Sequence, residues 1–174
     1  MVALRCPAPR IPSIGHMFAT IKDIAQIPDG AHRLQQVGTG DRTILAFWAT
    51  EQDAKEASDQ VYEVEDTITG PSAGGPRVCC TLVFMDGPLS QERWDAGAFA
   101  HERRIKPFLE GYDGYVDGCV LVDKVKRSAV AVGFATSFEK ADEIGKAVNS
   151  MELVPGEDPA LLTGPDRIEL YRVL

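Results

Sequence analysis

The second half of the chain alternates between two hydrophobic periods. Residues 77–85 form a short, apolar, β-branched run followed by turn residues, which predicts a strand. From Ser90 the apolar positions recur at helical spacing, which predicts an amphipathic helix that Pro107 kinks or ends. The pattern continues with strand, strand, helix and strand over residues 114–125, 128–135, 138–148 and 167–174. This βαββαβ order is that of the ferredoxin-like unit.

The first half follows the same plan less clearly. A helix is expected from about Ser13 to Gln26, and the later elements are a hairpin, a short helix and a strand over residues 31–37, 43–50, 52–58 and 61–68. Only Met1–Leu4 remain for an opening strand before a cluster of prolines. We therefore expect the first strand of this half to be very short or missing.

Self-similarity between the halves suggests a duplication. The segment TILAFWAT (43–50) matches AVAVGFAT (129–136) at an offset of 86 residues, and Thr50 and Thr136 each begin a Thr-x-x-acid pattern that caps a helix. A Gly/Pro-rich stretch separates the halves. The sequence thus predicts an α+β protein with a first ferredoxin-like repeat over residues 1–69, a linker over 70–76 and a second repeat over 77–174.

Composition limits the classes of partner. The chain has 174 residues, 44% of them hydrophobic, and a net charge of −8, so a globular protein that repels nucleic acid is expected. No apolar run is long enough to span a bilayer, and no membrane partner is predicted. Cys6, Cys79, Cys80 and Cys119 show no metal-binding spacing. We interpret them as reduced thiols of a cytoplasmic protein.

Two segments carry a family resemblance. PFLEGYDGYVDG leads into a strand, and VGFATSFEKADEI runs from a strand into a capped helix. Within the doubled βαββαβ order, these segments resemble the dimeric α+β barrel superfamily and, more narrowly, the antibiotic biosynthesis monooxygenase group. The resemblance implies two antiparallel sheets packed as an intrachain pseudo-dimeric barrel. A missing first strand would leave a sheet edge open, which predicts a homodimer.

The resemblance also implies a class of chemistry. Members of the group oxygenate aromatic polyketides without metal or flavin, or open haem oxidatively. Haem degraders of this superfamily carry a Trp in helix two and a His farther along it, whereas the corresponding segments here, QDAKEASDQ and FEKADEIGKAVNS, contain neither. The expectation is therefore a cofactor-independent monooxygenase that binds an apolar or aromatic small molecule.

Candidate site residues follow from their positions. His101 lies on the Trp94 side of the long helix and could act as a base, while Tyr115 follows a glycine at a strand start and could reach a cavity. These two are the catalytic candidates. The ligand-binding candidates are Trp94, Trp48, Phe134 and His32. Each aromatic can equally be a core residue, and spacing alone assembles no acid–base pair.

Two further functions stay open at this point. A barrel packed solid with apolar side chains would be a non-catalytic ligand carrier or interaction protein. A haem-binding protein would need an axial ligand, which only His16, His32 or His101 could supply.

Overall fold

Eight strands close into a barrel in the computed structural model, which describes residues 17–22 and 27–174. Around the barrel the order is β1-β3-β2-β8-β5-β7-β6-β4, and every neighbouring pair is antiparallel, including β1 with β4. The strands are β1 (Phe18–Lys22), β2 (His32–Gln36), β3 (Arg42–Trp48), β4 (Tyr62–Thr69), β5 (Cys79–Met85), β6 (Tyr115–Asp123), β7 (Ser128–Ala135) and β8 (Arg167–Val173).

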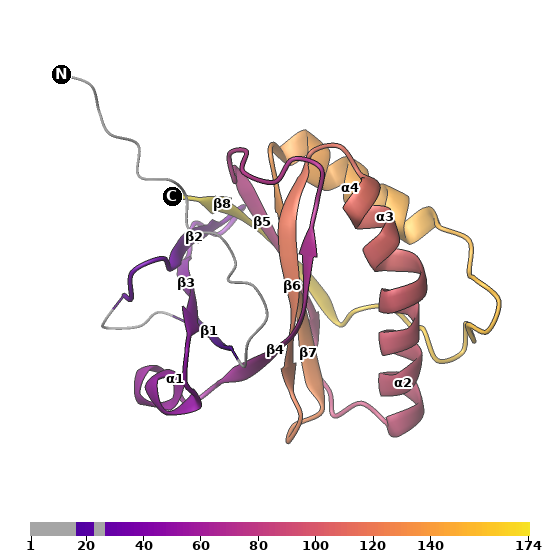
Figure 1. Ribbon diagram of the computed structural model, residues 1–174, viewed down its shortest axis with the longest axis horizontal. Coiled ribbons are helices and arrows are strands. Elements are labelled where there is room, and N and C mark those ends of the chain that lie inside the picture. The colour runs from indigo at the N-terminus through magenta and orange to yellow at the C-terminus, as the bar shows by residue number, and fades with distance from the viewer. Residues whose placement is uncertain (1–16, 23–26) are drawn as a thin grey trace.

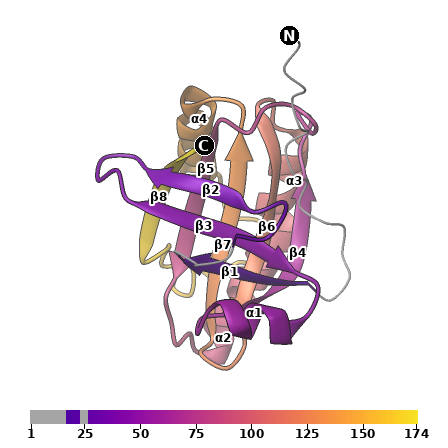
Figure 2. The ribbon, with the colours of Figure 1, turned by 90° about the vertical axis from the view of Figure 1, so that its left-hand side faces the viewer.

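Helices cover the barrel unevenly. A continuous helical rod, formed by α2 (Gln91–Ala100), the π-helical turn η1 (His101–Ile105) and α3 (Lys106–Gly111), lies with α4 (Phe138–Ser150) against the outside of β5, β6 and β7 (Figure 1). The short α1 (Glu51–Ala57) lies at one end of the first three strands, which cross in front of β5, β6 and β7 when seen from the other side (Figure 2). No helix of the described residues has the length and apolarity to cross a membrane.

The expected helix over residues 13–26 is wrong where the structure describes it, because Phe18–Lys22 form β1. The alternation of the segment explains the strand: Ala19 and Ile21 face the barrel core, while Thr20 faces outward and accepts a hydrogen bond from Trp48 Nε1 at 3.1 Å. The strand expected at Met1–Leu4 lies outside the described residues. β1 pairs on both sides, so the open edge that suggested a homodimer is absent from the described barrel.

The two matched strand-end aromatics do not occupy equivalent positions. Phe134 is fully buried inside the barrel, whereas Trp48 lies on the outside and Phe47 takes the inward position. The second helix cap is likewise Ser137 and not Thr136, because the Ser137 hydroxyl accepts from Lys140 N. Both differences shift the match by one residue, to an offset of 87. Since successive strand residues point to opposite faces, a shift of the alignment by one residue matches inward side chains of one half with outward side chains of the other.

The barrel interior is an apolar core with one polar cluster. Arg77 forms a buried ion pair with Asp117, its Nε lying 2.9 Å from Oδ1, and His32 packs beside it with its ring centre 4.6 Å from that of Phe134. His32 is only 3% exposed, and its Nε2 has no hydrogen-bond partner among the described residues. The core is otherwise filled by Ala19, Leu34, Leu45, Tyr62, Cys80, Leu82, Phe84, Val116, Cys119, Leu121, Val130, Val132, Phe134 and Tyr171.

We predict that acid destabilises the barrel through His32. Burial, and secondarily the charge of Arg77, lowers the pKa of His32 from 6.5 to about 4. The unfolded chain therefore binds a proton first as the pH falls below 6.5, and unfolding is favoured. Between pH 7.5 and 4.5 this one group should cost about 2–3 kcal/mol of unfolding free energy.

Urea denaturation at both pH values measures this effect as a difference between wild type and His32→Gln, which cannot titrate. Carboxylates contribute equally to both proteins and cancel. An equal loss of stability in the two proteins would show that His32 is not the titrating group.

Candidate functional site

The outer face of the sheet under the helical rod is not sealed. On β5, β6 and β7 the inward positions are buried, but the outward positions in the middle of these strands keep partial exposure. The registers place the outward residues side by side, because Val120 pairs with Ala131 and Ala131 with Val83. These outward positions are therefore not completely covered by the helices. We call the surface that these partly exposed outward residues form the floor. It consists of Thr81, Val83, Val120, Ala131 and Gly133.

Asp66 on β4 supplies the acidic group beside this floor. Regular alternation from Tyr62 and Val64, which face inward, would turn Asp66 into the core. A β-bulge between Val64 and Asp66 shifts the register, so that Asp66 pairs with the outward-facing Val120. The bulge thus re-aims a carboxylate from the barrel core to the space under the helices.

His101 and Lys106 on the helical rod both bind Asp66. His101 Nε2 lies 2.9 Å from Asp66 Oδ2, and Lys106 Nζ lies 2.7 and 2.8 Å from the two carboxylate oxygens. Residues five apart diverge on an α-helix of 3.6 residues per turn. Here the Lys106 N–H donates to His101 O across a π turn, which brings the two side chains to one side. We call Thr81, Val83, Val120, Ala131 and Gly133, with Asp66, His101 and Lys106, the outer-face site.

Pro107 accounts for the widened turn. It has no N–H to donate to Arg103 O, and its ring would crowd that carbonyl in a regular α-helix. The helix does not end there, as it continues to Gly111. The expected helix breaker instead changes the helical register next to the site.

The hydrogen bond to Asp66 decides which nitrogen of the neutral His101 ring carries the proton. Partial burial raises the pKa of the Asp66 carboxyl, but the hydrogen bonds from Lys106 and His101 outweigh it, and the net pKa lies below the ordinary value. An ionised carboxylate only accepts hydrogen bonds, so His101 Nε2 carries the proton that it shares with Asp66. In the neutral ring Nδ1 is then the nitrogen with a free lone pair. This arrangement can accept a proton from a bound ligand at Nδ1.

Tyr115 lies in the same layer, at the start of β6. It packs with Ile68 and Leu109 under α3 and α4, and Ile105, one turn beyond His101, packs against this cluster. Gly70 of the predicted linker lies so close to Tyr115 that a Cβ there would meet the Tyr115 backbone. The linker is also hydrogen-bonded to this segment, because Ser72 N donates to Tyr115 O at 3.1 Å.

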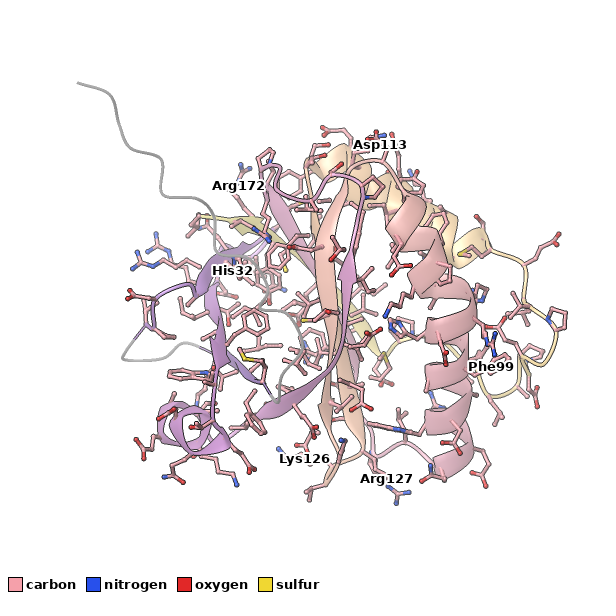
Figure 3. The ribbon with its side chains drawn as sticks, in the orientation of Figure 1. His32, Phe99, Asp113, Lys126, Arg127 and Arg172 are labelled. Carbon is pink, nitrogen blue, oxygen red and sulfur yellow. The ribbon has the colours of Figure 1, made fainter. Side chains whose placement is uncertain are left out.

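The other predicted residues divide between two places. Trp94 is half-buried and lies seven residues before His101, on the side of α2 that faces the sheet. His32 and Phe134 lie inside the barrel and Trp48 on the outside of β3, so none of the three belongs to the outer-face site. Figure 3 shows His32 among the interior side chains. Asp66 and Lys106 were not identified from the sequence. The strand segment of Asp66 also contains Glu63 and Glu65, so the sequence alone does not single out Asp66.

A depression in the surface lies on the other side of the helical rod, away from the outer-face site. It has a volume of about 360 Å³ and is lined by Phe99, Arg103, Val154 and Pro155. Phe99 points away from the sheet toward this loop (Figure 3). The loop is held by Arg104, whose Nε donates to Glu157 at 2.9 Å. Within the described residues, no group of three or more His, Cys, Asp or Glu side chains could hold a metal ion.

Comparisons with solved structures identify the fold. A monooxygenase-like protein from Listeria innocua superposes with a TM-score of 0.62 at 13% identity, covering 92% of this chain and 95% of the other. A ferredoxin-fold protein related to antibiotic biosynthesis monooxygenases, from Listeria monocytogenes, gives 0.60 at 12% identity, covering 92% and 96%. A haem-degrading enzyme from Listeria monocytogenes gives 0.53 at 11% identity, covering 91% and 99%.

Comparisons of sequence are less informative. No protein-family model matches the chain. A biotin synthase from Cytophaga hutchinsonii is 25% identical over 118 residues, which is 64% of this chain and 34% of that protein. The chain thus spans about a third of the length of the curated relative that it matches. What the comparisons establish is a mixed α+β, ferredoxin-like fold similar to that of antibiotic-biosynthesis-monooxygenase-like proteins.

We predict a measurable coupling between Asp66 and Lys106. In a double-mutant cycle of Asp66→Asn and Lys106→Met, the coupling free energy at pH 7 should be about 1–2 kcal/mol, because the pair is only partly exposed and charge-assisted. The pKa of Asp66 is lowered by folding, so this stabilisation is present above its unfolded value of 3.8 and is lost as the pH falls further. Urea denaturation of the four proteins at pH 7 and pH 2.5 measures it.

The exposed pair Lys146–Asp142 on α4 is the matched control. Its cycle should give a coupling of only about 0.3–0.5 kcal/mol. A coupling at Asp66–Lys106 that is no larger, or that survives at pH 2.5, would contradict the ion pair.

Proposed function

We propose that this protein is a cofactor-independent monooxygenase that binds a planar aromatic or polyketide-like molecule in the outer-face site. His101 is the general base. The observation that carries the proposal is the arrangement of three side chains: Lys106 keeps Asp66 ionised, Asp66 holds the Nε2–H of His101, and Nδ1 is left to accept a proton.

The floor of the site suits such a ligand. Val83, Val120 and Ala131 offer a flat apolar surface, and the half-buried Trp94 lies on the facing helix. The ions of the site neutralise each other, because Lys106 is paired with Asp66. An uncharged aromatic molecule is therefore favoured over an anionic one.

The reaction that fits is the oxygenation of an activated ring methylene. His101 Nδ1 takes one proton from the carbon and leaves a carbanion delocalised into the ring system. Dioxygen accepts the electrons. One of its oxygen atoms ends in a new carbonyl group on that carbon, and the other leaves as water with the two hydrogens that the carbon loses. The oxidant is dioxygen alone, so this scheme needs no metal or flavin.

We further propose that the chain is a tandem duplication of one ferredoxin-like unit. The orders β4-β1-β3-β2 and β8-β5-β7-β6 are the same when each half is numbered separately, and the halves join through β2 with β8 and β4 with β6. Each seam thus pairs a second strand with a fourth strand, as a two-fold axis would. We assign residues 1–69 and 77–174 as the repeats of a pseudo-dimer and 70–76 as the linker.

The state of the cysteines supports a reducing compartment. Cys79, Cys80 and Cys119 are buried free thiols. Burial raises the pKa of each of them above the ordinary value, so they are poor nucleophiles. A cytoplasmic location is consistent with these thiols and remains part of the proposal.

Haem binding is the second candidate function. Histidine ligands of metals usually carry a carboxylate on their other nitrogen, as His101 does with Asp66. His32 is packed in the barrel core and offers no space for haem, while His16 lies outside the described residues. His101 is therefore the only described histidine that fits as an axial ligand, through Nδ1.

Titration with haemin and a panel of hydroxyquinones and anthrone, followed by absorbance and thermal shift, tests these functions. Aerobic incubation with anthrone should yield anthraquinone without added metal or flavin. His101→Gln should lower this rate by about 10²–10⁴-fold, because it removes the base and keeps a polar side chain.

Arg103→Gln is the matched control, since Arg103 is exposed in the same π turn and lines the opposite face. It should leave the rate unchanged. Ligand binding without turnover would favour a non-catalytic carrier. A haemin Soret shift that is lost only in His101→Gln would favour the haem function, and no binding of any compound would reject the proposed site.

A further inference from the structure

The hydroxyl of Tyr115 is a buried polar group without a hydrogen-bond partner. The residue is 3% exposed, and its Oη makes no hydrogen bond with any described residue. Leaving such a group unpaired destabilises a folded protein, and native structures usually avoid it. An unpaired hydroxyl in the layer that holds the outer-face site is therefore a candidate hydrogen-bonding group for a ligand.

Two glycines show where this hydroxyl points. A Cβ at Gly118 would collide with Tyr115 Oη, and a Cβ at Gly133 would lie 3.2 Å from Cε2 and 3.7 Å from Oη of the same ring. The ring thus extends from the start of β6 along the strand and over the paired glycines. The next outward pair in this direction is Val120 with Ala131, on the floor of the outer-face site, where Asp66 holds His101.

A β-bulge makes this orientation compatible with the core. The register shifts between Tyr115 and Asp117, so that Tyr115 lies outside the barrel while Val116 and Asp117 turn inward. The hydroxyl and His101 consequently approach the same floor from two directions, one along the sheet and the other from the helical rod.

We propose that the Tyr115 hydroxyl donates a hydrogen bond to the carbonyl oxygen of the bound aromatic molecule, so that the site selects aromatic ketones. This inference rests on the proposed function of the outer-face site and deepens it. The role differs from that of His101: the base removes a proton from carbon, and Tyr115 binds the oxygen at which the negative charge accumulates.

The chemistry of the two groups is complementary. When a C–H bond of the ring methylene breaks, its proton goes to His101 Nδ1 and its electron pair is delocalised through the aromatic rings onto the ketone oxygen on the other side of the central ring. Tyr115 keeps its proton, because burial, reinforced by Cys119 and Asp117, holds its pKa well above the ordinary value. The hydrogen bond therefore strengthens as the enolate forms, which lowers the barrier.

Binding of two matched compounds tests this donor. Anthrone carries the ketone, and 9,10-dihydroanthracene has the same three-ring skeleton without it. Wild type should bind anthrone about tenfold more tightly, and Tyr115→Phe should abolish that preference while leaving the affinity for dihydroanthracene unchanged. Because Phe removes an unpaired hydroxyl, the melting temperature of the free variant should be unchanged or higher.

Gly133→Ala is the second variant. Its new methyl group meets only side-chain atoms of Tyr115 and would shift the ring by a few tenths of an ångström, which should reduce the ketone preference without removing the hydroxyl. For anthrone oxidation, Tyr115→Phe should lower kcat, while His101→Gln should lower kcat and leave the ketone preference in binding intact.

The outcomes separate the two proposals. Equal binding of both compounds by wild type, or a preference that survives Tyr115→Phe, overturns the role of Tyr115 and leaves the outer-face site standing. A lower melting temperature with unchanged binding shows that the hydroxyl is structural, paired with water only, and also overturns it. Binding of neither compound overturns the proposed function and this inference together.

Discussion

The candidate site depends on one carboxylate, that of Asp66. A strand residue that faces outward and two residues on a separate helix meet there, and none of them would do so with regular secondary structure. Uninterrupted alternation along β4 would bury Asp66 in an apolar core, where an unpaired carboxylate is very costly. A regular α-helix would turn Lys106 away from His101. The ion pair and the hydrogen bond offset the cost of both irregularities.

The closed barrel explains why the candidate site lies outside it. Eight antiparallel strands leave an interior that side chains fill, and here that interior holds aromatic and aliphatic residues around the Arg77–Asp117 pair. A ligand has no access to such a core. The outer face is different, because the helical rod meets the sheet mainly near α3, and outward residues such as Val83, Val120 and Ala131 keep partial exposure. The same sheet therefore has a closed core on one side and the partly exposed candidate site on the other.

Much of the fold could be predicted from the sequence. The period of the hydrophobic positions and the turn residues located the strands and helices of the second half to within a few residues. Long segments such as 128–135 and 138–150 have strong, uniform patterns. The helix expected over residues 13–26 was wrong in its described part, since Ala and Ile fit either period and only pairing with β3 decides for a strand. The match between the two halves was misaligned by one residue, an error that the similarity of short apolar strings cannot reveal but the facing of strand residues does.

The site was harder to predict for a related reason. His101 and Tyr115 could be proposed from their own segments, whereas Asp66 and Lys106 acquire their roles only through a bulge and a π turn. Neither irregularity has a pattern of its own in the sequence, apart from Pro107, which indicated a disturbed helix but not its direction. Contacts between β4 and the rod are separated by about 40 residues along the chain, so they follow from topology and not from spacing.

The irregularities themselves argue for function. In the part of the chain that the structure describes, the two register shifts of the barrel and the π turn all border the outer-face site. Each has a cost: the bulges leave residues out of the ladder, the π turn has poorer hydrogen-bond geometry, and Tyr115 keeps a buried hydroxyl unpaired. In a barrel selected for stability alone, these destabilising features would not be expected to lie together on one face. Their convergence on a partly exposed surface, with His101 and Tyr115 both beside it, is typical of a binding site for a small molecule.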